Sequence, residues 1–339
     1  MNLFLDSFDH YVTADLTQKW TSISNATISS AAGRRSSQGL RLITGGHYVS
    51  KTLVPSGATF ICGFSLNAAG FPTTQAALLR LYDSGVNQHV TINLTSAGLF
   101  EARRGTVSGT LLGTSATGIS AGVTNYIEIK ITVDNSAGVV QIMVNGVSIL
   151  NLTAQDTQNA GTASWVQFDL VNASSSGDDY DFDDLYVNDG SGTVNNGFNG
   201  DTRVECHYPN TNGNSNMSTP STGTDRYATI DEALVNGDTD YNTIASVNDK
   251  DTVNVENLKA TGATIKSVQS VLNMKKTDAG AATAVPVVRH STTDYDGSSQ
   301  SPSTAYQFFM QIYETNPGTG LAWTETNFNA AEFGYKRTA

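Results

Sequence analysis

The densest group of chemically active side chains in this sequence is a run of five aspartates: Asp178, Asp179, Asp181, Asp183 and Asp184. Clustered carboxylates can ligate a hard cation such as Ca²⁺ or serve in general acid–base catalysis. An EF-hand calcium loop starting at Asp179 would need a glycine at its sixth position and a glutamate at its twelfth. The sequence places Asp184 and Gly190 there. The run therefore does not fit an EF-hand.

Strand geometry gives this run a simpler interpretation. In a β-strand Tyr180 and Phe182 alternate with the acids, so the rings would face a core and the acids would face water. Asp184 breaks this alternation before Leu185 and Val187, which predicts a β-bulge. We therefore interpret the run as the charged last strand of a domain. A calcium ion bound at the rim of a sandwich remains an open but less favoured alternative.

Catalytic patterns are missing elsewhere in the sequence. A retaining glycosidase needs two carboxylates about 5 Å apart, and only Asp179 and Asp183 have a suitable spacing on one strand. The sequence contains no nucleophile elbow, zinc-protease motif, P-loop or dinucleotide fingerprint, and its five histidines are isolated. We therefore expect no enzyme, and the sequence singles out no catalytic, cofactor-binding or metal-ligating residue.

Composition restricts the partners. The net charge of −12 and the pI near 4.7 argue against nucleic acid, since phosphate binding needs a basic surface. No apolar run is long enough to cross a membrane, and the first residues lack the basic start of a secretion signal. We expect synthesis in the cytoplasm. Cys62 and Cys206 are too few for a disulfide framework or a zinc site, so free thiols are favoured, although the sequence leaves their state open.

Aromatic side chains could serve as platforms for sugars, because an apolar ring matches the C–H face of a pyranose. The three tryptophans lie beside strand-like segments and are predicted to be core residues: Trp20, Trp165 and Trp323. Tyrosines in loops are better placed for recognition: Tyr227, Tyr241 and Tyr295. The sequence does not select among them.

Alternation of apolar and polar residues dominates the chain and predicts antiparallel strands. It is clearest over residues 127–133 and 140–144, and Asn145–Gly146 then predicts a type I′ turn. Similar segments recur about every ten residues, separated by Gly, Asn, Ser and Pro, as in a β-sandwich or jelly roll. The ambiguous segment 264–276 is interpreted as a strand because it is rich in β-branched residues.

The composition changes near residue 190. We expect an all-β protein with a jelly-roll domain over 1–190, a Gly/Asn-rich linker over 191–200 and a β-rich domain over 201–339. Within the last part, residues 202–208 are predicted to form a strand. Residues 209–225 are predicted to form a loop, because they contain almost no large apolar side chains.

The first part resembles the concanavalin A-like, laminin-G-like jelly rolls. The resemblance lies in "SQGLRLITGGHYVSKTLV", "FICGFSLNA", "YIEIKITVDNSAGVVQIMVNGVSIL" and "YDFDDLYVNDGSG". It implies two β-sandwich domains, the first concanavalin A-like, whose last strand returns to pair beside its first. The pattern is informative about the fold and says little about a ligand.

The second part resembles a module found in virion proteins of tailed bacteriophages. The matching runs are "GDTRVECHYPNTNGN", "VVRHSTTDYDG" and "YETNPGTGLAWTETNFNAAEFGYKR". The resemblance carries over no catalytic residue. It implies a virion structural protein, made in the host cytoplasm, that packs against other capsid or tail subunits as a homo-oligomer. Head decoration and tail association are both open.

Two functions from different classes follow. The first is a structural protein exposed on the phage particle, acting by protein–protein packing and adhesion. The alternative is a carbohydrate-binding adhesin that recognises host surface glycans, with or without Ca²⁺. A polysaccharide-cleaving enzyme ranks last, because no carboxylate pair supports it.

Overall fold

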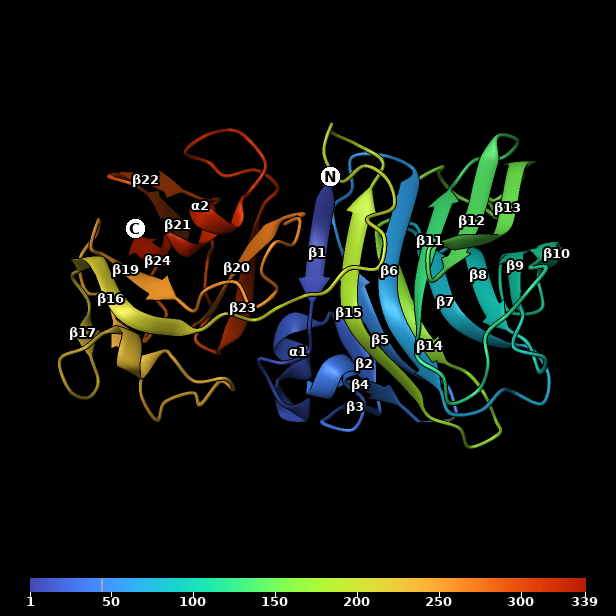
Figure 1. Cartoon of the computed structure of the whole chain (residues 1–339), viewed down its shortest axis with the longest axis horizontal. Helices are drawn as coiled ribbons and strands as arrows, with labels where there is room; N and C mark the ends of the chain where they lie inside the picture. The colour runs from blue at the N-terminus through green and yellow to red at the C-terminus, as the bar shows by residue number, and fades with distance from the viewer. Residues whose placement is uncertain (44) are drawn as a thin grey trace. The chain divides into compact units, whose positions relative to one another are not determined.

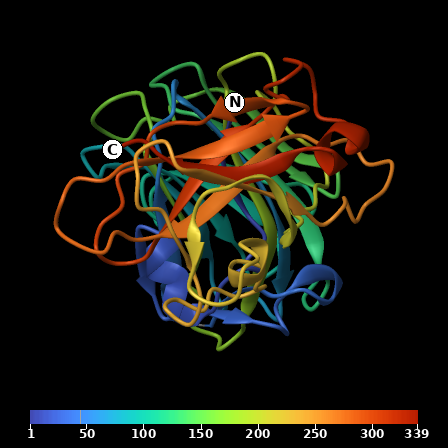
Figure 2. The ribbon, with the colours of Figure 1, turned by 90° about the vertical axis from the view of Figure 1, so that its left-hand side faces the viewer.

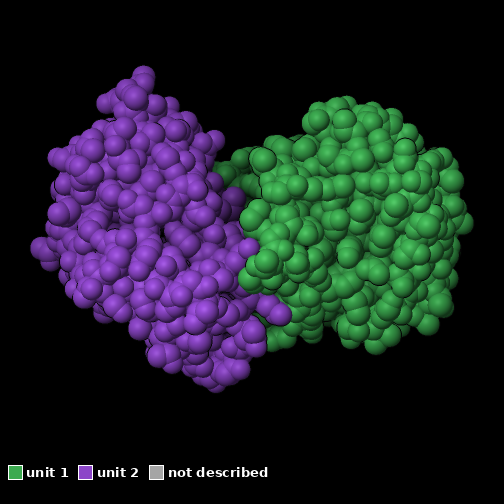
Figure 3. All heavy atoms as spheres, turned by 90° about the horizontal axis from the view of Figure 1, so that it is seen from above, with its two compact units in different colours: residues 1–204 green, residues 205–339 purple. Residues whose placement is uncertain are grey.

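The computed structural model describes residues 1–43 and 45–339, and nearly all of its regular structure is antiparallel β-sheet (Figure 1). The chain divides into two compact units, Met1–Val204 and Glu205–Ala339 (Figure 3). The predicted all-β class is confirmed. The Gly/Asn-rich segment expected as a linker, 191–200, belongs to the first unit.

The first unit contains two antiparallel sheets and three short helices. The eight-stranded sheet has the order β13 (Val147–Gln155), β12 (Gly138–Val144), β11 (Asn125–Thr132), β6 (Thr59–Ala68), β15 (Tyr180–Asp189), β4 (Gly39–Leu42) and β3 (Ala26–Ser29), with β1 (Asn2–Asp6) also paired to β15. The seven-stranded sheet has the order β10 (Thr110–Thr114), β9 (Phe100–Arg104), β8 (Gln88–Leu94), β7 (Ala76–Tyr82), β14 (Gln167–Asn172), β5 (His47–Thr52) and β2 (Ser22–Ser24). The helices are η1 (Thr13–Asp15), α1 (Leu16–Lys19) and η2 (Arg34–Ser36).

Aromatic side chains join the two sheets in the core of this unit. The ring of Phe60 on β6 lies 5.5 Å from that of Phe168 on β14 and 4.9 Å from that of Trp165. Trp20 packs edge-on against Phe168 at 6.0 Å. Each such ring gains about 1.5–3 kcal/mol from full burial. The prediction that Trp20 and Trp165 are core residues is confirmed, since they are 2% and 0% exposed.

Strand β15 lies at the centre of the eight-stranded sheet and bonds to three neighbours: β6, β4 and β1. Tyr180 and Phe182 point inward and are fully buried, as predicted. Asp184 then adopts a positive φ of 52°, and the pairing register with β6 shifts between Asp183 and Tyr186. The predicted bulge is confirmed. So is the return of the last strand beside the first.

The second unit has a five-stranded sheet and two two-stranded ribbons (Figure 2, yellow to red strands). The sheet order is β16 (Pro209–Asn216), β19 (Lys250–Val255), β24 (Glu332–Arg337), β21 (Ala284–His290) and β22 (Thr293–Asp296). The ribbons are β17 (Thr219–Pro220) with β18 (Asn242–Thr243), and β20 (Val268–Met274) with β23 (Gln307–Tyr313). Two short helices, η3 (Tyr227–Thr229) and α2 (Glu325–Asn329), complete the unit. Its core contains Val288, Trp323, Phe328, Ala331 and Phe333.

Two sequence predictions fail at the start of this unit. Residues 202–208 form no strand, and the strand instead covers Pro209–Asn216, which was expected to be a loop. The reason is that β16 is an edge strand held by polar bonds. Its backbone nitrogens at Asn214 and Ser215 donate to the side chains of Glu332 (2.8 Å) and Thr252 (3.1 Å). The interpretation of 264–276 as a strand is confirmed over Val268–Met274.

None of the helices in the described part of the chain is long and apolar enough to cross a membrane.

A buried ion pair connects β1 to α1 in the first unit. The Lys19 ammonium lies 2.9 Å from the Asp6 carboxylate, and both side chains are fully inaccessible. Asp6 also accepts hydrogen bonds from the Phe8 nitrogen (2.9 Å), the Tyr11 hydroxyl (2.8 Å) and the Trp20 indole (3.1 Å). Burial alone would raise the pKa of Asp6, but the charge of Lys19 and the hydrogen bonds from Lys19 and the Phe8 nitrogen hold it below its ordinary value. Asp6 therefore remains ionised inside the core.

Removing one member of this pair should destabilise the first unit strongly. Lys19→Met leaves Asp6 buried without its counter-ion, and we expect a loss of about 3–5 kcal/mol of unfolding free energy. Urea denaturation in a Trp323→Phe background measures it, because Trp20 and Trp165 then report the first unit alone. The double variant Lys19→Met/Asp6→Leu should lose less, since no charge stays buried. Equal stability of the single and double variants would contradict the assignment.

Candidate functional site

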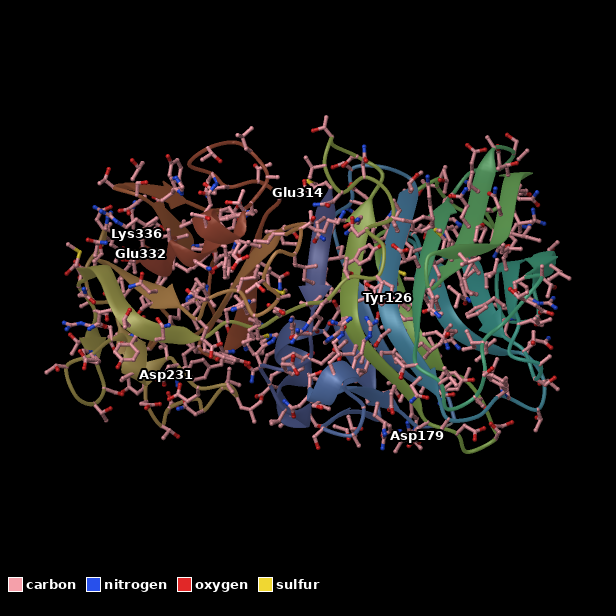
Figure 4. The ribbon with its side chains drawn as sticks, viewed as in Figure 1. Tyr126, Asp179, Asp231, Glu314, Glu332 and Lys336 are labelled. Carbon is pink, nitrogen blue, oxygen red and sulfur yellow. The ribbon has the colours of Figure 1, made fainter. Side chains whose placement is uncertain are left out.

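The acids at the start of the aspartate run face outward from the eight-stranded sheet, as predicted (Figure 4 labels Asp179). Arg41 on β4 binds both oxygens of Asp181, at 2.7 and 2.8 Å, and lies 3.4 Å from Asp179. This arginine offsets part of their negative charge. Arg41, Asp179 and Asp181 together form a cluster of ion pairs between β4 and the start of β15.

Asp183 departs from the prediction that it faces water. It is only 1% exposed, and its carboxylate accepts hydrogen bonds from the Arg34 nitrogen (2.7 Å), the Ser37 hydroxyl (2.9 Å) and the Asp184 nitrogen (2.7 Å). The loop around η2 lies over it, which an alternation pattern along β15 does not reveal. Burial and the neighbouring Asp184 charge raise the pKa of Asp183 to about 8.

Asp184 fastens the end of the first unit to β15. Its carboxylate accepts a hydrogen bond from the Val204 nitrogen at 2.8 Å, and Arg34 lies 3.4 Å away. The same arginine binds both oxygens of Asp201, at 2.6 and 2.7 Å. Among residues 1–43 and 45–339, no three His, Cys, Asp or Glu side chains group in a way that could hold a metal ion. Asp183 and Asp184 thus hold the η2 loop and the end of the first unit against β15.

The Gly/Asn-rich segment after β15 turns back along the outer face of the same sheet. Gly197 accepts a hydrogen bond from Asn188 (3.2 Å), and the Asn199 nitrogen donates to the Tyr186 hydroxyl (3.1 Å). The Gly200 nitrogen donates to Glu128 at 2.8 Å. Phe198 packs against a small cluster of Ile61, Tyr126 and Tyr186 (Figure 4 labels Tyr126). This part of the eight-stranded sheet is therefore covered by the protein's own chain.

The outer face of the seven-stranded sheet carries a row of polar side chains. Phe168 and Leu81, which are paired partners, are buried toward the core, so their neighbours along each strand point outward. Pairing registers align one outward residue from each of six adjacent strands: Arg103, Thr91, Arg80, Asp169, Ser50 and Ser22. A second, shorter row beside it contains Tyr82, Gln167 and Thr52.

Asp169 lies at the centre of this face and is only 5% exposed. Its carboxylate is hydrogen-bonded to the side chains of Ser50, Gln167 and Tyr82, and the Arg80 charge is close. Burial raises the pKa of Asp169. Burial and the Asp169 charge also raise the pKa of Tyr82 to about 12, so the phenol keeps its proton and can donate it in a hydrogen bond. We call Ser50, Arg80, Tyr82, Gln167 and Asp169 the Asp169 cluster.

The Asp169 cluster combines a guanidinium, a phenol, an amide and a hydroxyl around one carboxylate. These groups can hydrogen-bond ring hydroxyls, and the Tyr82 ring offers an apolar surface. A phenol with a raised pKa is a poor general base. These side chains are suited to hydrogen bonds and ring contacts with a polar ligand.

Sequence reasoning did not identify the Asp169 cluster. Its members lie in the segments "HYVSKTLV", "AALLRLY" and "VQFDLV", which were predicted as strands. The available indication was that their polar residues occupy the outward positions. The missing information was the register, which brings Arg80 opposite Asp169 and Tyr82 opposite Gln167.

The other residues singled out by the sequence have separate roles. Trp323 is buried and its indole donates to the Tyr313 carbonyl at 3.0 Å. Tyr241 is 40% exposed, whereas Tyr227 and Tyr295 are half-buried. The two cysteines are not joined in a disulfide; Cys62 is buried and Cys206 is half-buried.

Several charged side chains of the second unit form ion pairs on one sheet. Arg289 lies 2.7 Å from Asp294 and 3.9 Å from Glu332, and Lys336 lies 2.5 Å from Asp296 (Figure 4 labels Glu332 and Lys336). Lys250 also binds Asp294. The run "VVRHSTTDYDG" thus supports the fold through cross-strand charge pairing.

No protein-family model matches the chain, and no curated protein matches its sequence. Among solved structures, a sialidase is similar over 55% of this chain and 18% of its own, at 15% identity and a TM-score of 0.40. A carbohydrate-binding module from Bacillus subtilis is similar over 50% of this chain and 94% of its own, at 11% identity and 0.34. A carbohydrate esterase from the Shiga toxin-encoding bacteriophage phi24B is similar over 55% and 100%, at 15% identity and 0.36.

These similarities are all weak and each covers only about half of this chain. The chain also spans less than a fifth of the length of the sialidase. The neighbours include a carbohydrate-binding module and enzymes named for carbohydrates. Similarity at this level does not assign a reaction or a ligand to this protein.

The buried acid at the bulge should give the first unit a pH-dependent stability. Because the folded-state pKa of Asp183 is raised, its contribution falls as pH rises from the ordinary value of 3.8 to about 8. The slope reaches about 1.4 kcal/mol per pH unit. Asp183→Asn keeps an acceptor for the Arg34 nitrogen and should remove this slope. Urea denaturation from pH 5 to pH 8 in the Trp323→Phe background compares the variant with wild type.

Asp181→Asn is the matched control, because it makes the same substitution two positions earlier on the same strand. It should keep the wild-type slope. Parallel stability curves for wild type and Asp183→Asn would show that Asp183 does not carry the effect.

Proposed function

We propose that this protein binds carbohydrate without turning it over, and that the first unit holds the glycan on the outer face of its seven-stranded sheet. The observation that supports this most directly is the Asp169 cluster. A carboxylate that is 5% exposed, on the outward side of a sheet, is held by three neighbouring side chains. Such an arrangement fixes the positions of polar groups before a ligand arrives, which reduces the entropy lost on binding.

The surroundings of the cluster fit a sugar ligand. Tyr82 and Tyr48 are half-buried on this face and offer ring surfaces, while Gln167 and Arg80 offer several N–H donors. The Tyr82 phenol retains its proton and is not an activated nucleophile. Binding by hydrogen bonds and ring contacts is the chemistry that these side chains support.

We further propose that the protein is exposed on a tailed-bacteriophage particle, as a head-decoration or tail-associated structural protein. The support is the resemblance of the second part to virion modules, carried by runs such as "VVRHSTTDYDG" and "YETNPGTGLAWTETNFNAAEFGYKR". In this proposal it is made in the host cytoplasm, packs against other virion proteins as a homo-oligomer, and presents the Asp169 cluster to host surface glycans.

Loss of the Tyr82 ring should weaken glycan binding. Tyr82→Ala removes a ring surface and a donor to Asp169, and we expect at least a tenfold rise in Kd, which corresponds to about 1.4 kcal/mol. A glycan array with and without Ca²⁺ identifies the ligand, and titration calorimetry then measures Kd. Gln141→Ala, on β12 of the other sheet, is the matched control and should bind like wild type. An array without signal in both conditions would refute carbohydrate binding.

The virion location has its own test. Purified particles of the phage that encodes this protein should contain it at a fixed ratio to the major capsid or tail subunit, measured by quantitative mass spectrometry. Immunogold labelling of intact particles should place it on the head or the tail. Its absence from purified particles would refute the virion proposal and leave carbohydrate binding untouched.

A further inference from the structure

The charges on the outer face of the seven-stranded sheet cancel in pairs. Arg103 binds Glu101 with its Nε at 3.0 Å and its Nη2 at 2.9 Å, and it also donates to the Gly109 carbonyl at 2.9 Å. Both side chains of this pair are 16% exposed. The arginine is thus already bound to a carboxylate on its own strand.

Arg80 is offset less directly, by a carboxylate on the neighbouring strand, and it is hydrogen-bonded to Tyr82. It lies directly opposite Asp169 across the β7–β14 pairing, and its charge acts on both Asp169 and Tyr82. The titratable side chain of β8 is His89, at the register shift opposite Leu81 and Tyr82. It lies 3.8 Å from Asp83, and burial lowers its pKa, so it is neutral at physiological pH. The outward residues of β2, β5 and β14 add no further charge beyond Asp169.

The distance between the two tyrosines of this face, Tyr48 and Tyr82, indicates how long a ligand that contacts both would be. Tyr82 pairs with Gln167, and Tyr48 pairs with Val171, so they are separated by two strand spacings and four residues along the strands. With strands about 4.8 Å apart and a rise of about 3.4 Å per residue, the diagonal is about 17 Å. A single pyranose ring is much shorter than this distance.

We propose that the face binds an uncharged oligosaccharide, longer than a disaccharide, which lies diagonally between Tyr48 and Tyr82, and that Asp169 and Glu101 make the face discriminate against acidic sugars. A uronate or sialate would need a cation that is not already offset, whereas Arg103 is bound to Glu101 and the charge of Arg80 is offset by Asp169 opposite it. Its carboxylate would also approach Asp169, and like-charge contacts oppose binding. The overall charge of −12 acts in the same direction. This inference depends on the proposed carbohydrate-binding function.

The experiment compares two panels of defined ligands with the full-length protein. One contains neutral hexose oligosaccharides of one to six units, and the other contains hexuronate oligosaccharides of the same lengths. Wild type should bind at least one neutral series, with affinity rising from the disaccharide to the tetrasaccharide, and should bind the hexuronates at least tenfold more weakly.

Asp169→Asn tests the charge argument. It retains the shape of the side chain and leaves Arg80 without a counter-ion, so hexuronate affinity should increase at least tenfold. Burial of the Asp169 charge is unfavourable, so the variant should fold; thermal denaturation checks this. Glu101→Gln is a second variant that frees Arg103 without touching the Asp169 cluster, and it should show a smaller gain. Asp134→Asn, in the β11–β12 turn, changes the net charge equally and should show none.

The outcomes separate the two proposals. Wild-type preference for hexuronates would overturn this inference and leave carbohydrate binding in place, as would equal hexuronate affinities for Asp169→Asn, Glu101→Gln and Asp134→Asn. An affinity that does not depend on the length of the oligosaccharide would overturn the inference that the ligand reaches from Tyr48 to Tyr82. Binding to neither panel nor to the array would overturn the proposed function together with the inference.

Discussion

The fold of the first unit depends on a change of phase at one residue of β15. Asp184, at a φ of 52°, lets the strand keep Tyr180 and Phe182 inward before the bulge and Leu185 and Val187 inward after it. A non-glycine residue in the left-handed region costs about 1–2 kcal/mol. The hydrogen bonds to Arg34 and Val204 offset this cost, because the bulge turns two adjacent carboxylates toward the loop and the chain segment that they hold.

This arrangement also explains why the two sheets of the first unit have such different outer faces. The eight-stranded sheet is partly covered by the segment that follows β15, with Phe198 against Tyr126 and Tyr186. The close fit requires Gly63, where an added Cβ would lie 2.2 Å from the Tyr186 ring. The seven-stranded sheet carries the Asp169 cluster, in which Arg80, Tyr82 and Gln167 are half-buried, and Tyr48 is half-buried on the same face. This difference supports placing the proposed glycan site on the seven-stranded sheet.

The strands of the first unit could be predicted because their apolar and polar residues alternate with a period of two. Even the bulge was visible, since Asp184 interrupts that period. The pattern failed where polar bonding replaces apolar burial, as in β16, whose "PNTNGNSN" contains no large apolar side chain. It also failed for Asp183, because alternation shows which side of a strand a residue occupies and not what lies over that side. The Asp169 cluster was missed for a third reason: its members come from three strands, and their register is set by long-range pairing.

The path of the chain after β15 has a mechanical consequence. The chain leaves the first unit from the middle of β15 and not from its end, because residues 190–204 run back along the sheet and finish at Asp184. A tension applied through the second unit would act first on the backbone bond from Val204 to Asp184 and then on the bidentate contact between Arg34 and Asp201. The load would reach β15 only after both of these contacts had broken. It would then begin to separate β15 from its neighbouring strands. If the protein were pulled from both ends, the segment of about fifteen residues after β15 could therefore extend before either core opened.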